Sequence, residues 1–165
     1  MRAKSRLFVS LAALGMLFQL GVAHAATVVA LGASNTAGKG VSSGQAYPAQ
    51  LEIMLRARGL DVNVINAGIS GDTTGGMMAR LDSAVPKGTR VVILQPGGND
   101  LRKGARNYTP ELQTRLRSMG VKVVMLPNEM FRGKPHQPDG MHLTPEGYHM
   151  LAQQLLGPVT GALRR

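Results

Sequence analysis

The chain has 165 residues, of which 44% are apolar and 17% charged, and it contains no cysteine. This length and apolar content indicate one globular domain, and the lack of cysteine excludes a disulfide scaffold, a zinc ribbon and a catalytic thiol. The formal net charge of +10 favours anionic partners such as anionic lipid or acidic polysaccharide, or is simply a solvated basic face. Because only 4% of the residues are aromatic and none is Trp, we expect no nucleic-acid partner.

The first 25 residues have the pattern of a signal peptide. Three basic residues precede an almost wholly apolar run over 7–22, and an Ala-His-Ala cleavage signal follows at 23–25. We predict that residues 1–25 are removed and that 26–165 form a single periplasmic or secreted domain with no remaining membrane span. The formal net charge of that domain would be +7, since three of the 19 Lys and Arg lie in the removed segment. An uncleaved membrane anchor is the alternative.

The first element of the predicted domain is an unbroken β-prone run at 27–31 that ends in Gly32. Such a run is typical of a strand buried on both faces. A loop rich in Gly and Ser follows, and a helical pattern then begins at Pro48 and ends at Gly59, where a C-terminal cap is expected. The second strand is predicted at 62–65.

A polar turn at 66–74 leads into a shorter predicted helix around 77–81. Pro and Gly close that helix, and the third strand is predicted at 90–95. The next turn, at 97–100, has the sequence Gly-Gly-Asn-Asp.

Pro110 begins a further predicted helix that ends at Gly120, and the fourth strand is predicted at 121–126. Thr144 then caps the final helix. Strands that alternate with helices imply parallel pairing with right-handed crossovers. The predicted fold class is therefore α/β, a three-layer α/β/α sandwich around a flavodoxin-like parallel sheet of four to five strands.

In such a sheet, ligands bind beyond the carboxyl ends of the strands. Unusual polar and glycine-rich blocks follow the first three predicted strands, and another lies between the fourth strand and the last helix. The four blocks are Gly32-Ala33-Ser34-Asn35, Asn66 to Asp72, Gly97-Gly98-Asn99-Asp100 and Asp139-Gly140-Met141-His142.

These four blocks, in this order, resemble the SGNH (GDSL-type) hydrolase family, whose small secreted members include thioesterase/lysophospholipase and arylesterase enzymes. The resemblance spans residues 28 to about 156. It implies that Ser34 is the nucleophile, His142 its general base and Asp139 the group that orients His142. A serine hydroxyl needs such a base, and the imidazole needs a carboxylate to set its tautomer and stabilise its charged form.

The resemblance also implies an oxyanion hole formed by the backbone N–H groups of Ser34 and Gly71 and the side-chain amide of Asn99. We therefore expect an exported serine hydrolase that cleaves carboxylic esters or thioesters of a small ester or acyl substrate through an acyl-enzyme. The resemblance implies no cofactor and no metal.

Several alternatives remain open at this point. A polysaccharide O-deacetylase would use the same fold and triad, and a non-catalytic periplasmic binding protein could be built on a degenerate hydrolase scaffold. Each site residue taken alone could instead shape a turn or pack at a helix start. A metal site would have to use His136, Asp139, His142 and His149, whose spacing matches no recognised motif.

Two features depart from the family pattern. The first block has Ala33 and Asn35 where the family name implies an Asp and a Leu. Only 39 residues separate Asn99 from Asp139, where the family usually fits a further helix and strand. We therefore expect either a shortened sheet or a fourth-strand edge covered by the loop 127–138, and a shallow site that favours small esters.

Overall fold

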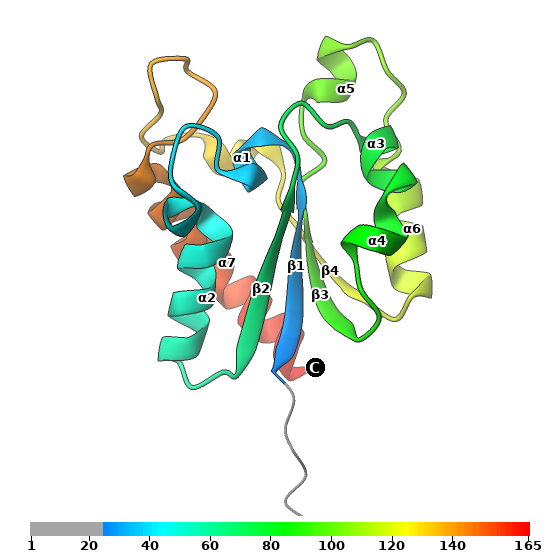
Figure 1. Ribbon diagram of the computed structural model, residues 1–165, viewed down its shortest axis with the longest axis vertical. Coiled ribbons are helices and arrows are strands. Elements are labelled where there is room, and N and C mark those ends of the chain that lie inside the picture. Colours follow the sequence, from blue (N-terminus) through cyan, green and yellow to red (C-terminus); the bar gives the residue numbers. More distant parts are fainter. Residues whose placement is uncertain (1–24) are drawn as a thin grey trace, which may run out of the picture.

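The computed structural model describes residues 25–165, so almost all of the predicted signal peptide lies outside the described residues. This part of the chain forms one sheet of parallel strands in the order β2-β1-β3-β4 (Figure 1). The strands are β1 (Ala26–Gly32), β2 (Val62–Gly68), β3 (Thr89–Leu94) and β4 (Lys122–Met125). The predicted parallel α/β fold is confirmed.

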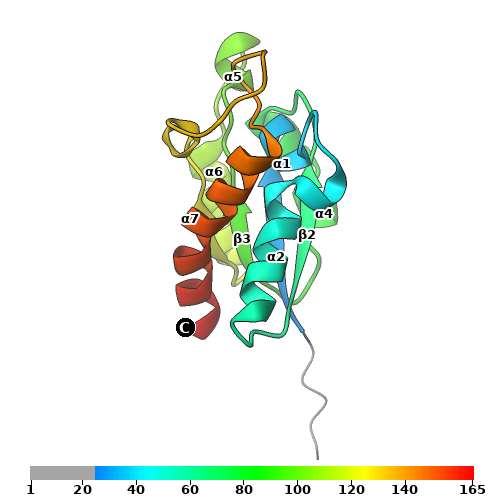
Figure 2. The same cartoon turned by 90° about the vertical axis from the view of Figure 1, so that its left-hand side faces the viewer.

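Helices cover both faces of this sheet. Helices α2 (Tyr47–Ala57) and α7 (Pro145–Arg164) pack together on one face, where they lie side by side in Figure 2. The other face carries α3 (Thr74–Ala79), α4 (Leu81–Ala84) and α6 (Thr109–Ser118) (Figure 1). The single turns α1 (Ser34–Ala37), η1 (Ser43–Gln45), α5 (Asn99–Arg102) and η2 (Asn128–Phe131) lie in the connections.

The strands are buried on both faces because their apolar residues alternate between two cores. In β1, Val28 and Ala30 pack with α2 and α7, whereas Val29 and Leu31 pack with α3, α4 and α6, and all four are 0% exposed. The two faces of β3 divide in the same way. The unbroken apolar run at 27–31 therefore indicated the right burial.

Three local predictions need correction. Strand β2 continues through the predicted polar turn to Gly68, because its last residues pair in register with Ala30 to Gly32 of β1. The predicted helix around 77–81 is two short helices that meet at Arg80, whose backbone is not helical. The turn at 97–100 contains the start of α5, which the sequence reading missed.

Of the two expectations for the fourth strand, the shortened sheet is the one observed. Within residues 25–165, β4 pairs only with β3. Its residues are half-buried and line a groove with Pro158 and Ala162 of α7 and with Arg165, which follows α7. The loop 127–138 does not line this groove. Among the described helices, none has both the length and the apolar character needed to cross a bilayer.

Close packing at the carboxyl end of β1 positions the residues that follow. A Cβ at Gly32 would lie 2.2 Å from Thr36 Oγ1, and one at Gly68 would lie 2.2 Å from the backbone N of Ala37, so both positions require glycine. Buried Gln95, just after β3, accepts hydrogen bonds through Oε1 from Thr36 Oγ1 (2.6 Å) and the Ala33 N–H (3.2 Å). The turn that begins α1 is therefore held against the ends of its neighbouring strands.

Candidate active site

Ser34 is the first residue of α1, immediately beyond β1. Its Oγ lies 2.9 Å from Nε2 of His142. His142 comes from the loop before α7, is 4% exposed, and its Nδ1 lies 2.5 Å from Oδ2 of Asp139. The structure thus brings Ser34 into contact with His142, 108 residues later in the chain, and places all three residues assigned to the triad together.

The electrostatics of Asp139 determine which way this chain of hydrogen bonds runs. The His142 side chain, and then the backbone N–H groups of His142 and Met141, hold the pKa of the Asp139 carboxyl well below its usual range. An ionised carboxylate accepts hydrogen bonds and cannot donate, so Nδ1 of His142 is the donor to Asp139. In the neutral imidazole, Nε2 then carries the lone pair that faces the Ser34 hydroxyl.

Gln137 fixes the loop that carries His142. Its Nε2 donates to the carbonyl oxygens of Leu143 (2.7 Å) and Lys39 (2.8 Å), and its backbone N–H donates to the His142 carbonyl oxygen (2.7 Å). Thr144 caps α7 as predicted, because its Oγ1 accepts from the Gly147 N–H at 3.2 Å. The general-base candidate is therefore tied both to the loop after α1 and to the start of α7.

Asn35, one of the departures from the family pattern, links three elements of the site. Its Nδ2 donates to the Met141 carbonyl oxygen (3.1 Å), and its Oδ1 accepts from the Tyr148 hydroxyl (3.0 Å). Burial raises the pKa of Tyr148 to about 12, so its hydroxyl is protonated at neutral pH and can donate. An apolar residue at position 35 could make neither bond.

The predicted oxyanion residues line the same pocket as Ser34 and His142. Gly71 has a backbone φ of 80°, which favours glycine, and Asn99 is 6% exposed. Asn99 Nδ2 donates to the Asp72 carbonyl oxygen at 2.6 Å, and its Oδ1 accepts from Arg102. Because an amide nitrogen has two hydrogens, the second Nδ2 hydrogen is left for a ligand.

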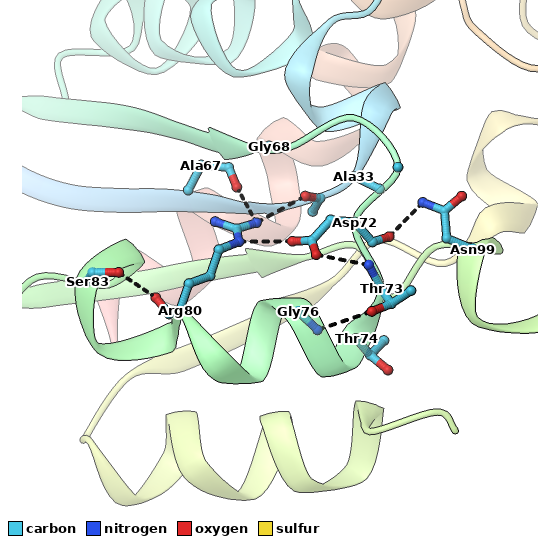
Figure 3. A network of polar contacts seen from close by, with 12 residues as sticks. Ala33, Ala67, Gly68, Asp72, Thr73, Thr74, Gly76, Arg80, Ser83 and Asn99 are labelled. Carbon is cyan, nitrogen blue, oxygen red and sulfur yellow. Dashed lines mark hydrogen bonds and ion pairs between the residues drawn. The ribbon is translucent and has the colours of Figure 1, made fainter. Parts of the chain in front are cut away.

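A polar network that reaches Asn99, one of the predicted oxyanion residues, was not predicted from the sequence (Figure 3). Arg80 Nε lies 2.9 Å from Asp72 Oδ2, and the guanidinium also donates to the carbonyl oxygens of Ala67 (2.9 Å) and Gly32 (3.3 Å). The side chains of Arg80 and Asp72 are only 19% and 10% exposed. Arg80 therefore joins the ends of β1 and β2 to the turn that holds Asn99. A lone Arg at a predicted helix position carries no sequence signal for this role.

Asp100 supports its turn in a similar way. It is 3% exposed, and its carboxylate accepts from the backbone N–H of Thr74 (3.1 Å) and from Thr74 Oγ1 (2.8 Å). The start of α3 is thereby attached to α5.

The pocket around these residues has a volume of about 310 Å³. Its walls combine the candidate catalytic groups with the apolar side chains of Phe131 and Met141 and with the cations Lys39 and Arg102. Ala33 lies in the wall as well, where the family name implies an Asp. A space of this size lies at the lower end of the range for small-molecule sites.

The four residues considered as metal ligands do not form one cluster: Asp139 and His142 bond each other, whereas His136 and His149 have other partners. Nδ1 of His136 faces the Lys134 carbonyl oxygen at 2.7 Å, and Nδ1 of His149 faces Gln50 Oε1 at 3.1 Å. Over residues 25–165, no three His, Asp or Glu side chains form a group that could hold a metal ion.

Comparison with known proteins gives consistent matches. Residues 30–133 match the family model described as the GDSL-like Lipase/Acylhydrolase family. The chain is 37% identical to Esterase TesA of Pseudomonas aeruginosa over 113 residues, which are 63% of this chain and 55% of that protein. It is 33% identical to Arylesterase of Vibrio mimicus over 129 residues, which are 72% of this chain and 63% of that protein. The chain spans 44% to 63% of the length of the curated relatives that it matches.

Among solved structures, the crystal structure of TesA superposes with a TM-score of 0.67 at 25% sequence identity. The superposition covers 82% of this chain and 99% of that chain. The four-stranded core is therefore the same fold.

Proposed function

The chain belongs to the GDSL-like lipase/acylhydrolase family, and from that premise we propose that it hydrolyses carboxylic esters or thioesters through an acyl-enzyme on Ser34. The observation that carries the proposal is the continuous contact from Asp139 through His142 to Ser34 at a pocket of about 310 Å³. A serine hydroxyl with a base at 2.9 Å is arranged for activation as a nucleophile.

In the proposed first half-reaction, Ser34 Oγ attacks the substrate carbonyl while Nε2 of His142 takes the hydroxyl proton. Asp139 stabilises the imidazolium that forms. The oxygen of the tetrahedral intermediate accepts hydrogen bonds from Asn99 Nδ2 and from the backbone N–H groups of Ser34 and Gly71. His142 then returns the proton to the leaving oxygen or sulfur as the bond to the carbonyl carbon breaks.

In the second half-reaction, water attacks the acyl group on Ser34. His142 takes a proton from that water, and the collapse of the second tetrahedral intermediate releases the acid and returns the proton to Ser34 Oγ. The pocket volume supports small acyl groups as substrates, in line with the expectation from the short segment between Asn99 and Asp139.

A fluorophosphonate probe with peptide mapping tests this proposal, with Ser34→Ala as the control. Phosphonylation at Ser34 is expected, together with loss of ester turnover in a folded Ser34→Ala protein, because the variant has no nucleophile. A folded wild-type protein that is not labelled would support the non-catalytic binding protein instead. Acetate release from acetylated polysaccharide, measured beside aryl ester hydrolysis, separates a deacetylase from an esterase.

We also propose that the protein is exported to the periplasm or the medium. The basic, apolar and Ala-His-Ala pattern of residues 1–25 supports this proposal. The same peptide map is expected to begin at Ala26. A map that begins at Met1 in protein recovered from the membrane fraction would favour the uncleaved anchor.

A further inference from the structure

We propose that the preferred substrate is an ester with a negatively charged group, a carboxylate or a phosphate, that binds to Lys39 and Arg102 at the mouth of the pocket. This inference rests on the proposed ester hydrolysis and adds the class of substrate.

The charge of the pocket lining carries the first step of the argument. Lys39 and Arg102 both line the pocket, and no Asp or Glu from residues 25–165 does so. Lys39 comes from the loop after α1 and Arg102 from α5, and these elements lie on either side of the end of β1 (Figure 1). A charged group in the pocket is thus approached by cations from two elements.

The second step is the position of the cations relative to the oxyanion residues. Arg102 donates to Oδ1 of Asn99, and Nζ of Lys103 donates to the Gly71 carbonyl oxygen at 2.7 Å. Arg102 and Lys103 therefore contact two of the residues assigned to the oxyanion hole, whereas Lys39 lines the pocket from the loop after α1. An anionic group a few bonds from the scissile carbonyl would lie within reach of Arg102, whose guanidinium has further donors for a planar anion.

The third step is that these cations have no counter-charge within the protein. Arg56, Arg80, Arg106 and Arg115 each pair with a carboxylate. Among the described residues, Lys39, Arg102 and Lys103 form no such ion pair. Asp139, the carboxylate of the proposed triad, is already bonded to His142 and to two backbone N–H groups. Cations that line a pocket without a carboxylate partner raise the local concentration of anionic substrates there.

The same cations would also stabilise the negative oxygen of any tetrahedral intermediate. The two roles differ in what they predict. Stabilisation of the tetrahedral oxygen raises kcat/KM equally for neutral and anionic esters. An anion subsite instead raises kcat/KM for the anionic ester relative to that for the neutral one. The selectivity ratio is therefore the quantity to measure.

Matched ester pairs test the inference. The pairs are 4-acetoxybenzoate with 4-acetoxybenzamide, which places the charge on the leaving group, and phenyl hydrogen succinate with phenyl succinamate, which places it on the acyl group. 4-Acetoxyphenyl phosphate tests the phosphate form, and phenyl acetate reports ester hydrolysis without any charge. We expect the anionic member of at least one pair to have a kcat/KM about fivefold higher at low salt, and this advantage to shrink as the ionic strength rises.

Variants then assign the effect to the pocket. Lys39→Gln and Arg102→Gln are each expected to lower the anionic-to-neutral ratio by about twofold to threefold. Lys87→Gln removes the same charge at the loop before β3, at the other end of the sheet, and is the matched control whose ratio should equal that of the wild type.

The outcomes are distinguishable. Two results would overturn the anion subsite and leave the proposed hydrolase intact, provided that phenyl acetate is hydrolysed. One is an anionic-to-neutral ratio of kcat/KM near one in both pairs and for the phosphate. The other is a ratio that falls as much in Lys87→Gln as in the pocket variants. Equal losses on neutral and anionic esters in Arg102→Gln and Lys39→Gln overturn it in favour of general oxyanion stabilisation. Failure to hydrolyse phenyl acetate or any charged ester overturns the proposed function and this inference together.

Discussion

Asp139 illustrates how one side chain can determine the direction of a hydrogen-bond chain. Its carboxylate accepts from Nδ1 of His142 and from two backbone N–H groups. With the proton of the neutral imidazole on Nδ1, Nε2 is free to accept from Ser34. Asp139→Asn would present an amide whose orientation can favour the opposite tautomer. We expect kcat to fall by a factor on the order of 10⁴, while Ser34 and His142 stay in place.

The lowered pKa of Asp139 also predicts a pH dependence of stability. A group with a depressed pKa in the folded state stabilises the protein fully above the pKa of the unfolded chain, about 3.9 for Asp. That stabilisation is lost as the pH falls from there toward the folded value. The free energies of urea unfolding of wild type and Asp139→Asn should therefore differ at pH 5, and this difference should shrink below about pH 4. A difference that disappears between pH 5 and 7 would contradict this assignment.

The turn between β2 and α3 is held by Arg80, whose side chain connects this turn to the ends of β1 and β2. Arg80 lies where α3 and α4 meet, and it bonds Asp72 and the carbonyl oxygens of Gly32 and Ala67 (Figure 3). The Asp72 carbonyl oxygen in turn accepts from Asn99. Arg80 therefore supports the side of the pocket that contains Asn99, the residue proposed for the oxyanion hole.

Arg80→Met would leave Asp72 without its counter-charge and two strand-end carbonyls without a donor. We expect a loss of about 3 kcal/mol in the free energy of unfolding, measured by urea denaturation, because both partners are mostly buried. We also expect a lower kcat with a smaller change in KM, since Asn99 would lose its fixed orientation. Arg115→Met is the matched control, because its ion pair with Asp82 is exposed and should be worth less than about 1 kcal/mol. Equal stability and kcat in the two variants would show that the Arg80 network has no special role.

The strand order predicts how stability is distributed over the protein. Strands β1 and β3 lie in the middle of the sheet with both faces covered, whereas within residues 25–165 β4 pairs only with β3. Amides that open only by global unfolding are the slowest to exchange. We expect hydrogen exchange measured by mass spectrometry to be slowest in β1 and β3 and clearly faster in β4. Protection of β4 equal to that of β1 would indicate that something covers its outer edge in solution.

Much of the fold could be predicted because its signals are local. The β-prone run at 27–31 and the apolar run at 91–94 indicated buried strands, and Pro48 and Thr144 marked the starts of helices α2 and α7. The end of β2 could not be predicted, because its polar residues become a strand only through pairing with β1.

The grouping of the candidate site residues at one edge of the sheet was predictable to a similar depth. The order of the four blocks pointed to Ser34, Asp139 and His142, and parallel strands bring their carboxyl ends to one edge. The support around these residues was not predictable. Asn35 reaches Tyr148 across 113 residues, and Arg80 reaches Gly32 across 48.

The amino-acid sequence was therefore sufficient for the order of the strands and of the longer helices along the chain, for the fold class and for the chemical types at the strand ends, because periodicity and turn chemistry act over a few residues. Tertiary packing decided that, within residues 25–165, β4 pairs only with β3. It also decided that Arg80 and Asn35 link the elements around the candidate site, and that Lys39 and Arg102 line one pocket. Those properties arise from contacts between distant segments. Their energies depend on the burial and geometry that only the folded chain provides.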